Sequence, residues 1–333
     1  MFADRFDYAV AHVDLDMSQD RVLVVGPVDL NEYPQLTSMS AEIYSDSFLV
    51  VRDALERGLT ASAEISGEFD TAIVCCPRSK PLARHFVGIA SRAVGSKGRI
   101  ILDGNKTDGI EPLLKAVKAE TALDFTLSKA HGKIALVTAG DFLDWIQDDY
   151  IVTETGLKTK IGVFSADGID AGSAFLLEHM PVKLGARVAD LGAGWGYLSS
   201  QILERFDVKS LHLVESQKTA LECAQENCAD DRVSFHWADA MDWKCKEPLD
   251  AIVMNPPFHI GRAADPSLGL AFIRSAARNL ASHGQLIMVA NRQLPYEEEL
   301  NARFARVEEV AKNGRFKVFH ASRPRKVERT RRN

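Results

Sequence analysis

Short apolar runs recur along the chain, and each is closed by a glycine-rich or polar stretch. Three of them lie in the first half, at 21–26, 69–75 and 98–102, and a helical pattern over 81–94 leads into the third. Short apolar runs bounded by turn residues are typical of buried strands, and strands that alternate with helices predict a parallel sheet covered on both faces. We therefore expect the first half of the chain to fold as an α/β unit.

The second half of the chain repeats this order. Its apolar runs lie at 187–192, 249–253 and 284–288, and a Ser-x-Gly turn precedes the third run in both halves. Self-similarity of this kind predicts a duplicated domain. The polar segment 147–159 interrupts the pattern and marks the linker. The fold class that we expect is α/β, with two tandem doubly wound Rossmann-like domains.

These patterns divide the chain into three parts. We expect a first domain over 1–150, a second domain over 151–322 and a basic tail over 323–333, which contains a proline and has no apolar pattern. A length of 333 residues suits two domains of roughly 150 residues each. An apolar content of 46% with 26% charged residues is ordinary for a globular enzyme.

Hydropathy and cysteine content bear on location and on metal binding. No apolar stretch approaches the ~18 residues of a membrane span, and the first residues lack the regions of a signal peptide. We therefore expect a cytoplasmic protein. The five cysteines form no Cys-x-x-Cys pair, so we expect buried thiols and neither a disulfide framework nor a metal site. The oligomeric state is left open.

Basic residues gather in two segments, 78–106 and 315–332, although the net charge is −6. The overall acidity argues against a general nucleic-acid binder. Charged clusters are usually solvated surface, but two basic segments on an acidic protein can bind the phosphates of a specific RNA while the remainder repels other RNA. Charge alone leaves both interpretations open.

The two halves differ where a ligand would bind. After its first strand, the first half has Gly26-Pro27-Val28-Asp29, in which the proline lacks a backbone donor. The second half has Gly192-Ala193-Gly194-Trp195-Gly196 at this place. After the second strand, Cys76-Pro77-Arg78-Ser79 stands where the other half has Asn255-Pro256-Pro257-Phe258. We therefore expect a degenerate, catalytically inactive first domain that serves folding or RNA binding.

The segment after the apolar run 249–254 is the clearest candidate for chemistry. Prolines cannot donate to a sheet, so the strand must stop at Asn255, at the carboxyl edge where open α/β sheets bind ligands. The Asn255 side-chain oxygen and a main-chain carbonyl beside the prolines are two acceptors for the two hydrogens of a planar amino group. Phe258 offers a face on which a base can stack. The motif indicates methylation of an exocyclic nitrogen, and a plain strand-ending turn is the alternative.

Acidic residues follow other strands of the second half. Asp190 precedes a loop whose glycines, which let the backbone approach a ligand closely, are Gly192, Gly194 and Gly196. Glu215 follows the run 210–214 and can accept both ribose hydroxyls, and a surface acid at a strand end is the alternative. Asp239 follows the run 232–238 and can accept from an adenine amino group. Together with Asn255, these strand ends predict a nucleoside-binding site.

This order of features resembles a class I S-adenosylmethionine-dependent methyltransferase. Four stretches, 162–173, 255–259, 289–296 and 313–318, narrow the resemblance to the RsmC-like family of ribosomal RNA guanine methyltransferases. The family implies S-adenosyl-L-methionine as cofactor, ribosomal RNA or a ribosomal subunit as partner, and methylation of the 2-amino group of guanine. It also implies a duplicated fold with a degenerate first domain. The chain departs from the family at Ile161, where members usually have proline.

The resemblance implies cofactor contacts for individual residues. The methionine part would be held by Asp190 and by the loop with Gly192, Gly194 and Gly196, the ribose by Glu215, and the adenine by Asp239. Phe164 and Ser165 would line the site from the preceding segment. Packing before the next helix is an equally good explanation of these two residues when the family is left aside.

The resemblance places the catalytic segment at Asn255, Pro256, Pro257 and Phe258. The Asn255 oxygen and the Pro256 carbonyl would accept the two hydrogens of the guanine amino group, and Phe258 would stack on the base. The nitrogen would then be drawn toward tetrahedral geometry with its lone pair facing the methyl group, so that transfer is an in-line displacement without a metal. The target base must be unpaired or flipped out of a duplex.

Small-subunit (16S) ribosomal RNA is the substrate that we expect. Three alternatives stay open, namely the same reaction on large-subunit (23S) ribosomal RNA, methylation of a protein glutamine, and a non-catalytic RNA-binding or assembly factor. A glutamine carboxamide would use the same pocket, and the overall acidity keeps that substrate open. The basic segments favour RNA. The complete Asn255 to Phe258 motif argues against a non-catalytic role.

Overall fold

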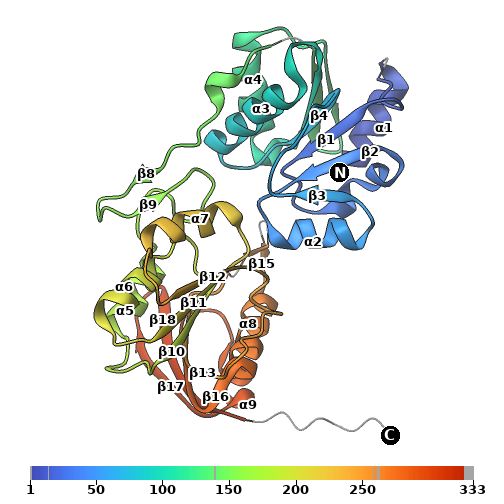
Figure 1. Cartoon of the computed structure of the whole chain (residues 1–333). Helices are drawn as coiled ribbons and strands as arrows, with labels where there is room; N and C mark the ends of the chain where they lie inside the picture. Colours follow the sequence, from blue (N-terminus) through green and yellow to red (C-terminus); the bar gives the residue numbers. More distant parts are fainter. Residues whose placement is uncertain (1, 14, 139, 258, 261–262, 326–333) are drawn as a thin grey trace, which may run out of the picture. The chain divides into compact units, whose positions relative to one another are not determined.

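The computed structural model describes residues 2–13, 15–138, 140–257, 259–260 and 263–325. The chain divides into two compact units, residues 1–149 and 150–333, which we call unit 1 and unit 2 and describe separately. Both are α/β units in which helices accompany a twisted sheet (Figure 1). Among the described residues, no helix is long and apolar enough to cross a membrane.

Unit 1 is built on a seven-stranded sheet of order β3-β2-β1-β4-β5-β7-β6 (Figure 1). All neighbouring strands are parallel except that β7 is antiparallel to β5 and β6. The strands are β1 (Arg21–Val25), β2 (Ser40–Tyr44), β3 (Thr60–Ser62), β4 (Thr71–Cys75), β5 (Arg99–Asn105), β6 (Phe125–Lys129) and β7 (Gly132–Val137). The α-helices are α1 (Phe2–His12), α2 (Phe48–Glu56), α3 (Lys80–Val94) and α4 (Ile110–Glu120).

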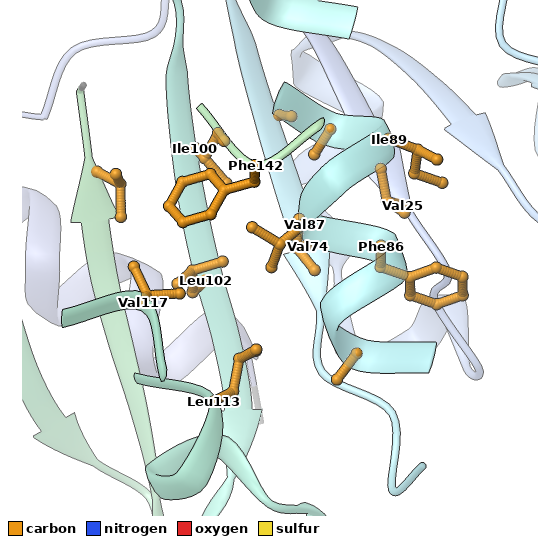
Figure 2. Close-up of a cluster of buried hydrophobic side chains, with 14 of the residues drawn as sticks. Val25, Val74, Phe86, Val87, Ile89, Ile100, Leu102, Leu113, Val117 and Phe142 are labelled. Carbon is orange, nitrogen blue, oxygen red and sulfur yellow. The ribbon is translucent and has the colours of Figure 1, made fainter. Parts of the chain in front are cut away.

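The central strands of unit 1 are apolar because helices cover both faces of the sheet. All five residues of β4 are buried, which is typical of a parallel strand with two covered faces. On one face, Val74 and Leu102 from the strands lie against Val87 of α3 and Val117 of α4 (Figure 2). Burial of such a side chain stabilises the fold by about 1.5–3 kcal/mol.

Unit 2 has a seven-stranded sheet of order β12-β11-β10-β13-β16-β18-β17, in which β18 is antiparallel to β16 and β17. Its strands are β10 (Arg187–Leu191), β11 (Ser210–Glu215), β12 (Val233–Trp237), β13 (Leu249–Met254), β16 (Leu280–Asn291), β17 (Phe304–Lys312) and β18 (Phe316–Pro324). The helices are α5 (Ala171–Glu178), α6 (Tyr197–Arg205), α7 (Lys218–Asn227), α8 (Pro266–Asn279) and α9 (Glu297–Arg303). Two small hairpins pair β8 (Ile151–Val152) with β9 (Lys158–Thr159), and β14 (His259–Ile260) with β15 (Ala263–Ala264).

The two sheets have the same strand order and the same strand directions, which confirms the predicted tandem α/β fold. Some details of the prediction were wrong. The run 98–102 continues as a strand to Asn105 because β7, which we did not predict, pairs with that extension. Strand β18 runs through Pro324 and so includes the first residues of the segment assigned to the basic tail. The tail residues 326–333 lie outside the described residues.

The strand registers also correct one equivalence between the halves. In unit 1, Val25 at the end of β1 pairs with Val74, and in unit 2, Leu191 at the end of β10 pairs with Met254. The position equivalent to Asn255 is therefore Cys75 rather than Cys76, which the sequence comparison had matched. The prolines that follow misled that comparison, because unit 2 has two of them where unit 1 has one.

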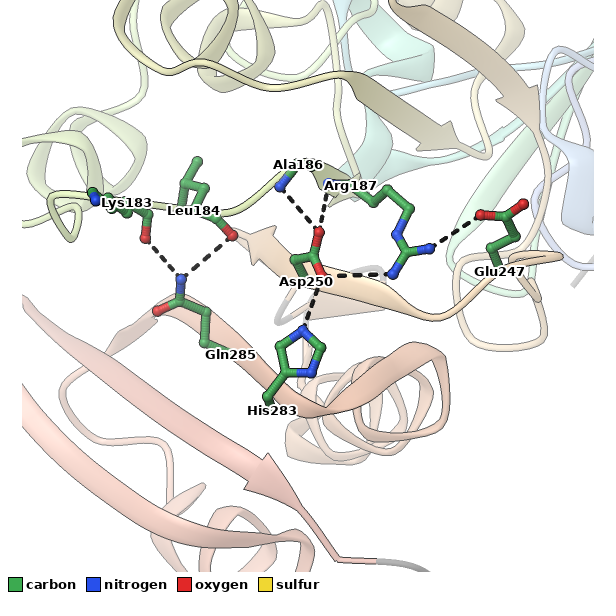
Figure 3. A network of polar contacts seen from close by, with 8 residues as sticks. All are labelled: Lys183, Leu184, Ala186, Arg187, Glu247, Asp250, His283 and Gln285. Atoms are coloured by element: carbon green, nitrogen blue, oxygen red, sulfur yellow. Dashed lines mark hydrogen bonds and ion pairs between the residues drawn. The ribbon is translucent and has the colours of Figure 1, made fainter.

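A polar network closes the amino edge of the unit 2 sheet (Figure 3). The Asp250 carboxylate accepts from the backbone N–H groups of Ala186 at 3.0 Å and Arg187 at 2.9 Å. It also contacts His283 of β16 at 3.1 Å, so one side chain joins the starts of β10 and β13 to β16. Gly185 has φ +95°, and a Cβ there would lie 2.4 Å from that of Asp250. The Asp250 carboxylate is thus paired at the amino edge, opposite the carboxyl edge where the sequence predicts the ligand site.

Candidate active site

A pocket lies at the carboxyl edge of the unit 2 sheet, with about 420 Å³ of empty space that includes its opening to solvent. Its walls are the loop after β10, the start of α6, the segment before α5, and the residue after β13. Five of the predicted site residues line it, namely Phe164, Ser165, Gly192, Gly194 and Asn255. Four others are not among its lining residues. Asp190, Glu215 and Asp239 lie at or just after neighbouring strand ends, and Gly196 is the N-cap of α6.

The loop from Gly192 to Gly196, which we call the glycine loop, turns because its glycines adopt left-handed conformations. Gly192, Gly194 and Gly196 have φ of +76°, +56° and +86°, a region that other residues rarely adopt. The Gly192 N–H donates to the Val214 carbonyl at 2.8 Å, which ties the loop to β11. A Cβ on Gly194 would meet nothing within 4 Å, so that glycine serves the backbone conformation and not a close contact.

Glu215 fixes the glycine loop from the end of β11. Its Oε2 accepts from the Gly194 N–H at 2.9 Å, and its Oε1 accepts from the Gln217 N–H at 2.8 Å. The side chain is only 8% exposed. Oε1 also accepts from the Ser216 hydroxyl at 3.3 Å. Oε2 can accept a second hydrogen bond, so Glu215 can hold the loop and a ligand hydroxyl together.

Asp239 has a similar place after β12. Its Oδ1 accepts from the Met241 N–H at 2.8 Å, and the side chain is 4% exposed. The indole N–H of Trp237 donates to the Ser216 carbonyl at 2.8 Å, which links the ends of β11 and β12. The two acids therefore lie on adjacent strands at one edge of the sheet, as the sequence suggested.

Asp190 is fully buried at the end of β10. Its Oδ2 accepts from the Ser199 hydroxyl of α6 at 2.8 Å, while its buried Oδ1 has no hydrogen-bond partner among the described residues. Burial raises the pKa of Asp190 to about 7, the Ser199 hydrogen bond opposes the rise, and the charge of Glu215 adds to it. The carboxylate is thus an acceptor that a cationic donor would stabilise in its charged form.

The segment before α5 borders the pocket. Phe164 is 64% exposed, and its carbonyl accepts from the indole N–H of Trp195 at 3.1 Å. Ser165 has φ +55°, unusual for a residue other than glycine, and its hydroxyl donates to the Gly168 carbonyl at 2.9 Å. Trp195 is buried, and its hydrogen bond anchors this segment. Left-handed residues other than glycine concentrate at ligand sites.

Asn255 is held in one orientation. Its Nδ2 donates to Asp170 Oδ2 at 2.8 Å and to Ser173 Oγ at 2.9 Å. A carboxylate can only accept, so the nitrogen must face Asp170 and the oxygen must face away from it. Within the described residues, Asn255 Oδ1 accepts no hydrogen bond, and the residue lines the pocket. An amide oxygen is thus available at the carboxyl edge.

The prolines after Asn255 differ in exposure, since Pro256 is buried and Pro257 is exposed. Phe258, for which we predicted a stacking role, lies outside the described residues. Among the residues that the structure does describe, no group of His, Cys, Asp and Glu side chains is arranged to hold a metal ion.

Three residues of the site were missed by the sequence analysis as candidates, namely Asp170, Ser173 and Ser199. The first two belong to a stretch that carried the family resemblance, and Asp-x-x-Ser before an apolar segment is a helix N-cap signal. That signal explains the cap but not the contact with Asn255, which is 85 positions away in the sequence.

Comparisons with known proteins agree with this geometry. The model of the methyltransferase small domain matches residues 154–320. A ribosomal RNA small subunit methyltransferase C from Shewanella sp. (strain MR-4) is 29% identical over 264 residues, which cover 76% of this chain and 77% of that protein. The protein of the same name from Erwinia tasmaniensis is 28% identical over 339 aligned positions, with 97% and 98% covered.

A solved structure shares the fold of the whole chain. It is the T. Thermophilus 16S rRNA N2 G1207 methyltransferase (RsmC) in complex with AdoMet and guanosine, with 23% identity and a TM-score of 0.78 over 96% of this chain and 91% of that chain. These findings confirm the predicted RsmC-like resemblance and the tandem fold. Since the domain model spans half of the sequence and includes the whole pocket, the chain belongs to the methyltransferase small domain family.

Proposed function

We propose that this protein transfers the methyl group of S-adenosyl-L-methionine to the exocyclic 2-amino group of a guanine in small-subunit (16S) ribosomal RNA. The observation that carries the proposal is the oriented Asn255 amide, whose oxygen is available at the pocket. The relatives named ribosomal RNA small subunit methyltransferase C support the substrate class. The guanosine and AdoMet in the solved protein of the same fold support the base and the cofactor.

The residues at the carboxyl edge fit S-adenosyl-L-methionine. Asp190 has a buried oxygen without a donor among the described residues, which suits the positive charge of the methionine part beside the glycine loop. Glu215 has acceptor capacity left for ribose hydroxyls, and Asp239 can accept from the adenine amino group. Phe164 and Ser165 would close the site from the other side. The bound cofactor supplies the activated methyl group.

Asn255 activates the guanine 2-amino group for methyl transfer. The lone pair of the guanine 2-amino group is delocalised into the ring, so the nitrogen is a poor nucleophile. Asn255 Oδ1 and the Pro256 carbonyl accept its two hydrogens, which favours tetrahedral geometry and directs the lone pair at the methyl group. Positioning supplies most of the acceleration. Phe258 stacks on the base, and the surplus proton leaves to water after transfer.

The remaining parts of the chain bind RNA or support folding. We assign residues 1–150 to a degenerate domain for folding or RNA binding, residues 151–322 with the last residues of strand β18 to the catalytic domain, and the basic residues after that strand to contacts with RNA phosphates. Because the proposed substrate is ribosomal RNA, we expect the protein to act in the cytoplasm. Part of the basic segment 78–106 is neutralised within unit 1, since Arg78 pairs with Asp108 and Arg99 with Asp20. Its RNA contacts must therefore use the other cations.

The experiment is methyl transfer from labelled S-adenosyl-L-methionine to ribosomal subunits and stripped ribosomal RNA from cells that lack this protein, followed by digestion to nucleosides. We expect label in 2-methylguanosine from the small subunit or from 16S RNA. Label in 23S RNA would redirect the substrate assignment. Bound cofactor without label in any RNA would contradict the proposal and would direct the search to protein glutamines or to a non-catalytic role.

A further inference from the structure

The start of α5 packs directly onto the side chain of Asn255. Asp170 is the N-cap of α5, and its Oδ2 accepts from the Ser173 N–H at 2.8 Å. The same Oδ2 accepts from Asn255 Nδ2 at 2.8 Å. A Cβ on Gly172 would lie 3.0 Å from Asp170 Oδ2 and 3.5 Å from Asn255 Nδ2, so glycine at this position permits the close approach.

We propose that Asp170 and Ser173 are positioning residues, which hold the Asn255 amide so that its oxygen faces the substrate amino group. The inference rests on the proposed function, because it takes Asn255 Oδ1 as the acceptor in the reaction. Both hydrogens of Asn255 Nδ2 are used by these two residues, at 2.8 and 2.9 Å. The oxygen is therefore left for the pocket.

A rotation of the amide by half a turn is unfavourable in this arrangement. It would place Asn255 Oδ1 against the Asp170 carboxylate, which has no hydrogen to donate, and it would break both hydrogen bonds. Without Asp170 and Ser173, either end of the amide could face the substrate. An amide nitrogen in that place would repel the guanine amino group, since both are donors.

The charge of Asp170 has a second effect. Hydrogen bonds in a chain polarise one another, so an amide that donates to a carboxylate becomes a stronger acceptor at its oxygen. Asp170 would therefore strengthen the bond from Asn255 Oδ1 to the substrate as well as orient it. Asp170→Asn keeps an acceptor oxygen and an N-cap but removes the charge, so it separates the two effects.

The test measures single-turnover methyl transfer at saturating substrate, KM for the RNA substrate and the dissociation constant for S-adenosyl-L-methionine in the full-length protein. The variants are Asp170→Ala, Asp170→Asn, Ser173→Ala and Asn255→Ala. Asp250→Ala is the matched control, because this carboxylate also accepts from backbone N–H groups but lies at the opposite edge of the sheet (Figure 3). The unfolding midpoint of each variant is measured in parallel.

We expect Asp170→Ala to slow transfer by about 100-fold, as a misplaced reacting group does, and Ser173→Ala and Asp170→Asn by roughly tenfold. The dissociation constant for the cofactor and the KM for RNA should change by less than about threefold. Asp250→Ala should lower the unfolding midpoint with an unchanged rate of transfer. If Asp170→Ala fails to fold, the other two variants carry the test.

Different results separate the inference from the proposed function. If Asn255→Ala loses transfer while Ser173→Ala and both Asp170 variants keep the normal rate, the positioning role is wrong and the proposed function stands. If the Asp170 variants lose cofactor affinity to the same extent as rate, Asp170 acts on the cofactor site and the inference is also wrong. If Asn255→Ala keeps the normal rate, Asn255 is not the acceptor and the proposed mechanism fails with the inference.

Discussion

The two units carry the same sheet, but they differ at the strand ends. When the glycines that follow β1 and β10 are matched, the strand registers make Val24 of unit 1 equivalent to Asp190 of unit 2, and Ser45 equivalent to Glu215. Unit 1 thus has an aliphatic side chain and a hydroxyl where unit 2 has two carboxylates. Because these changes leave the apolar strands intact, a fold can persist after its ligand site has been lost.

The position of Asn255 shows the same contrast. Its counterpart Cys75 is a buried thiol in contact with Tyr33, and burial raises its pKa well above the ordinary value. Beside it, Arg5 of α1 donates to Asp103 Oδ2 at 2.7 Å, and both side chains are almost fully buried. In unit 2, the equivalent edge is a pocket. Unit 1 therefore uses these positions for internal packing.

The largest effect that we expect is the loss of transfer in Asn255→Ala. Removal of a preorganised group in an active site commonly costs about 100–1,000-fold in rate, and this variant also removes the amide that Asp170 and Ser173 hold. Cofactor affinity should stay nearly unchanged. The matched change Cys75→Ala in unit 1 should leave the rate of transfer as it is. Equal loss in both variants would break the comparison, since it would give unit 1 a part in catalysis.

Arg5→Ala should destabilise unit 1 by about 3–5 kcal/mol, because it leaves Asp103 charged and buried without its partner. Burial already raises the pKa of Asp103, and Arg5 opposes that rise. Hydrogen exchange followed by mass spectrometry would show faster exchange in β1 and β5. The double change Arg5→Met with Asp103→Leu should recover most of the loss. The single and the double variant should both still bind the cofactor through unit 2. A loss of binding would contradict a purely structural role of Arg5 and Asp103.

The pKa of Asp190, raised to about 7, should make the stability of unit 2 depend on pH. The folded state holds a proton that the unfolded state releases near the ordinary value of 3.8, so the contribution of Asp190 to stability is greatest below that value and is lost as pH rises through about 7. The slope is at most about 1.4 kcal/mol per pH unit. Asp190→Asn should remove this contribution in hydrogen exchange of β10. Strand β1, with Val24 at the equivalent position, is the internal control. If the Asp190→Asn variant keeps the pH dependence of stability, another group is responsible for it.

Much of this organisation could be predicted from the sequence. Apolar runs with glycine turns identified the central strands of both units, because buried parallel strands are apolar on both faces. Edge strands such as β3 and β6 were not predicted, since they are short and half-exposed and leave only a weak pattern. Site residues at the strand ends could be predicted because the carboxyl ends of parallel strands lie at the same edge of a sheet.

The arrangement of side chains at that edge could not be predicted in the same way. Asp190 was predicted to contact the cofactor, but its hydrogen bond to Ser199 on the following helix was not predicted. The contact of Asp170 with Asn255 joins segments that are distant in the sequence. Such contacts depend on how helices pack onto the sheet, and one sequence carries no direct record of that packing.

The smallest effect concerns exposed cations beside an antiparallel strand pair that recurs in both units, β16 with β18 and β5 with β7. Arg292 donates its backbone N–H to the Arg315 carbonyl at 2.8 Å, and Lys106 and His131 make the same bond in unit 1 at 3.0 Å. Within the described part of unit 2, Arg292 and Arg315 are exposed and form no ion pair, and they lie where the sheet's carboxyl edge meets solvent. We predict that both bind phosphates of the RNA substrate.

The double change Arg292→Ala with Arg315→Ala should therefore raise KM for RNA and leave the rate at saturation unchanged. Each lost phosphate contact should reduce the slope of log affinity against log salt by about one. Lys209→Ala is the matched control, because Lys209 is exposed but precedes β11 at the opposite edge of the sheet. The corresponding change Lys106→Ala then tests whether unit 1 shares the RNA surface. An altered salt slope in that variant would show that unit 1 contributes to substrate binding.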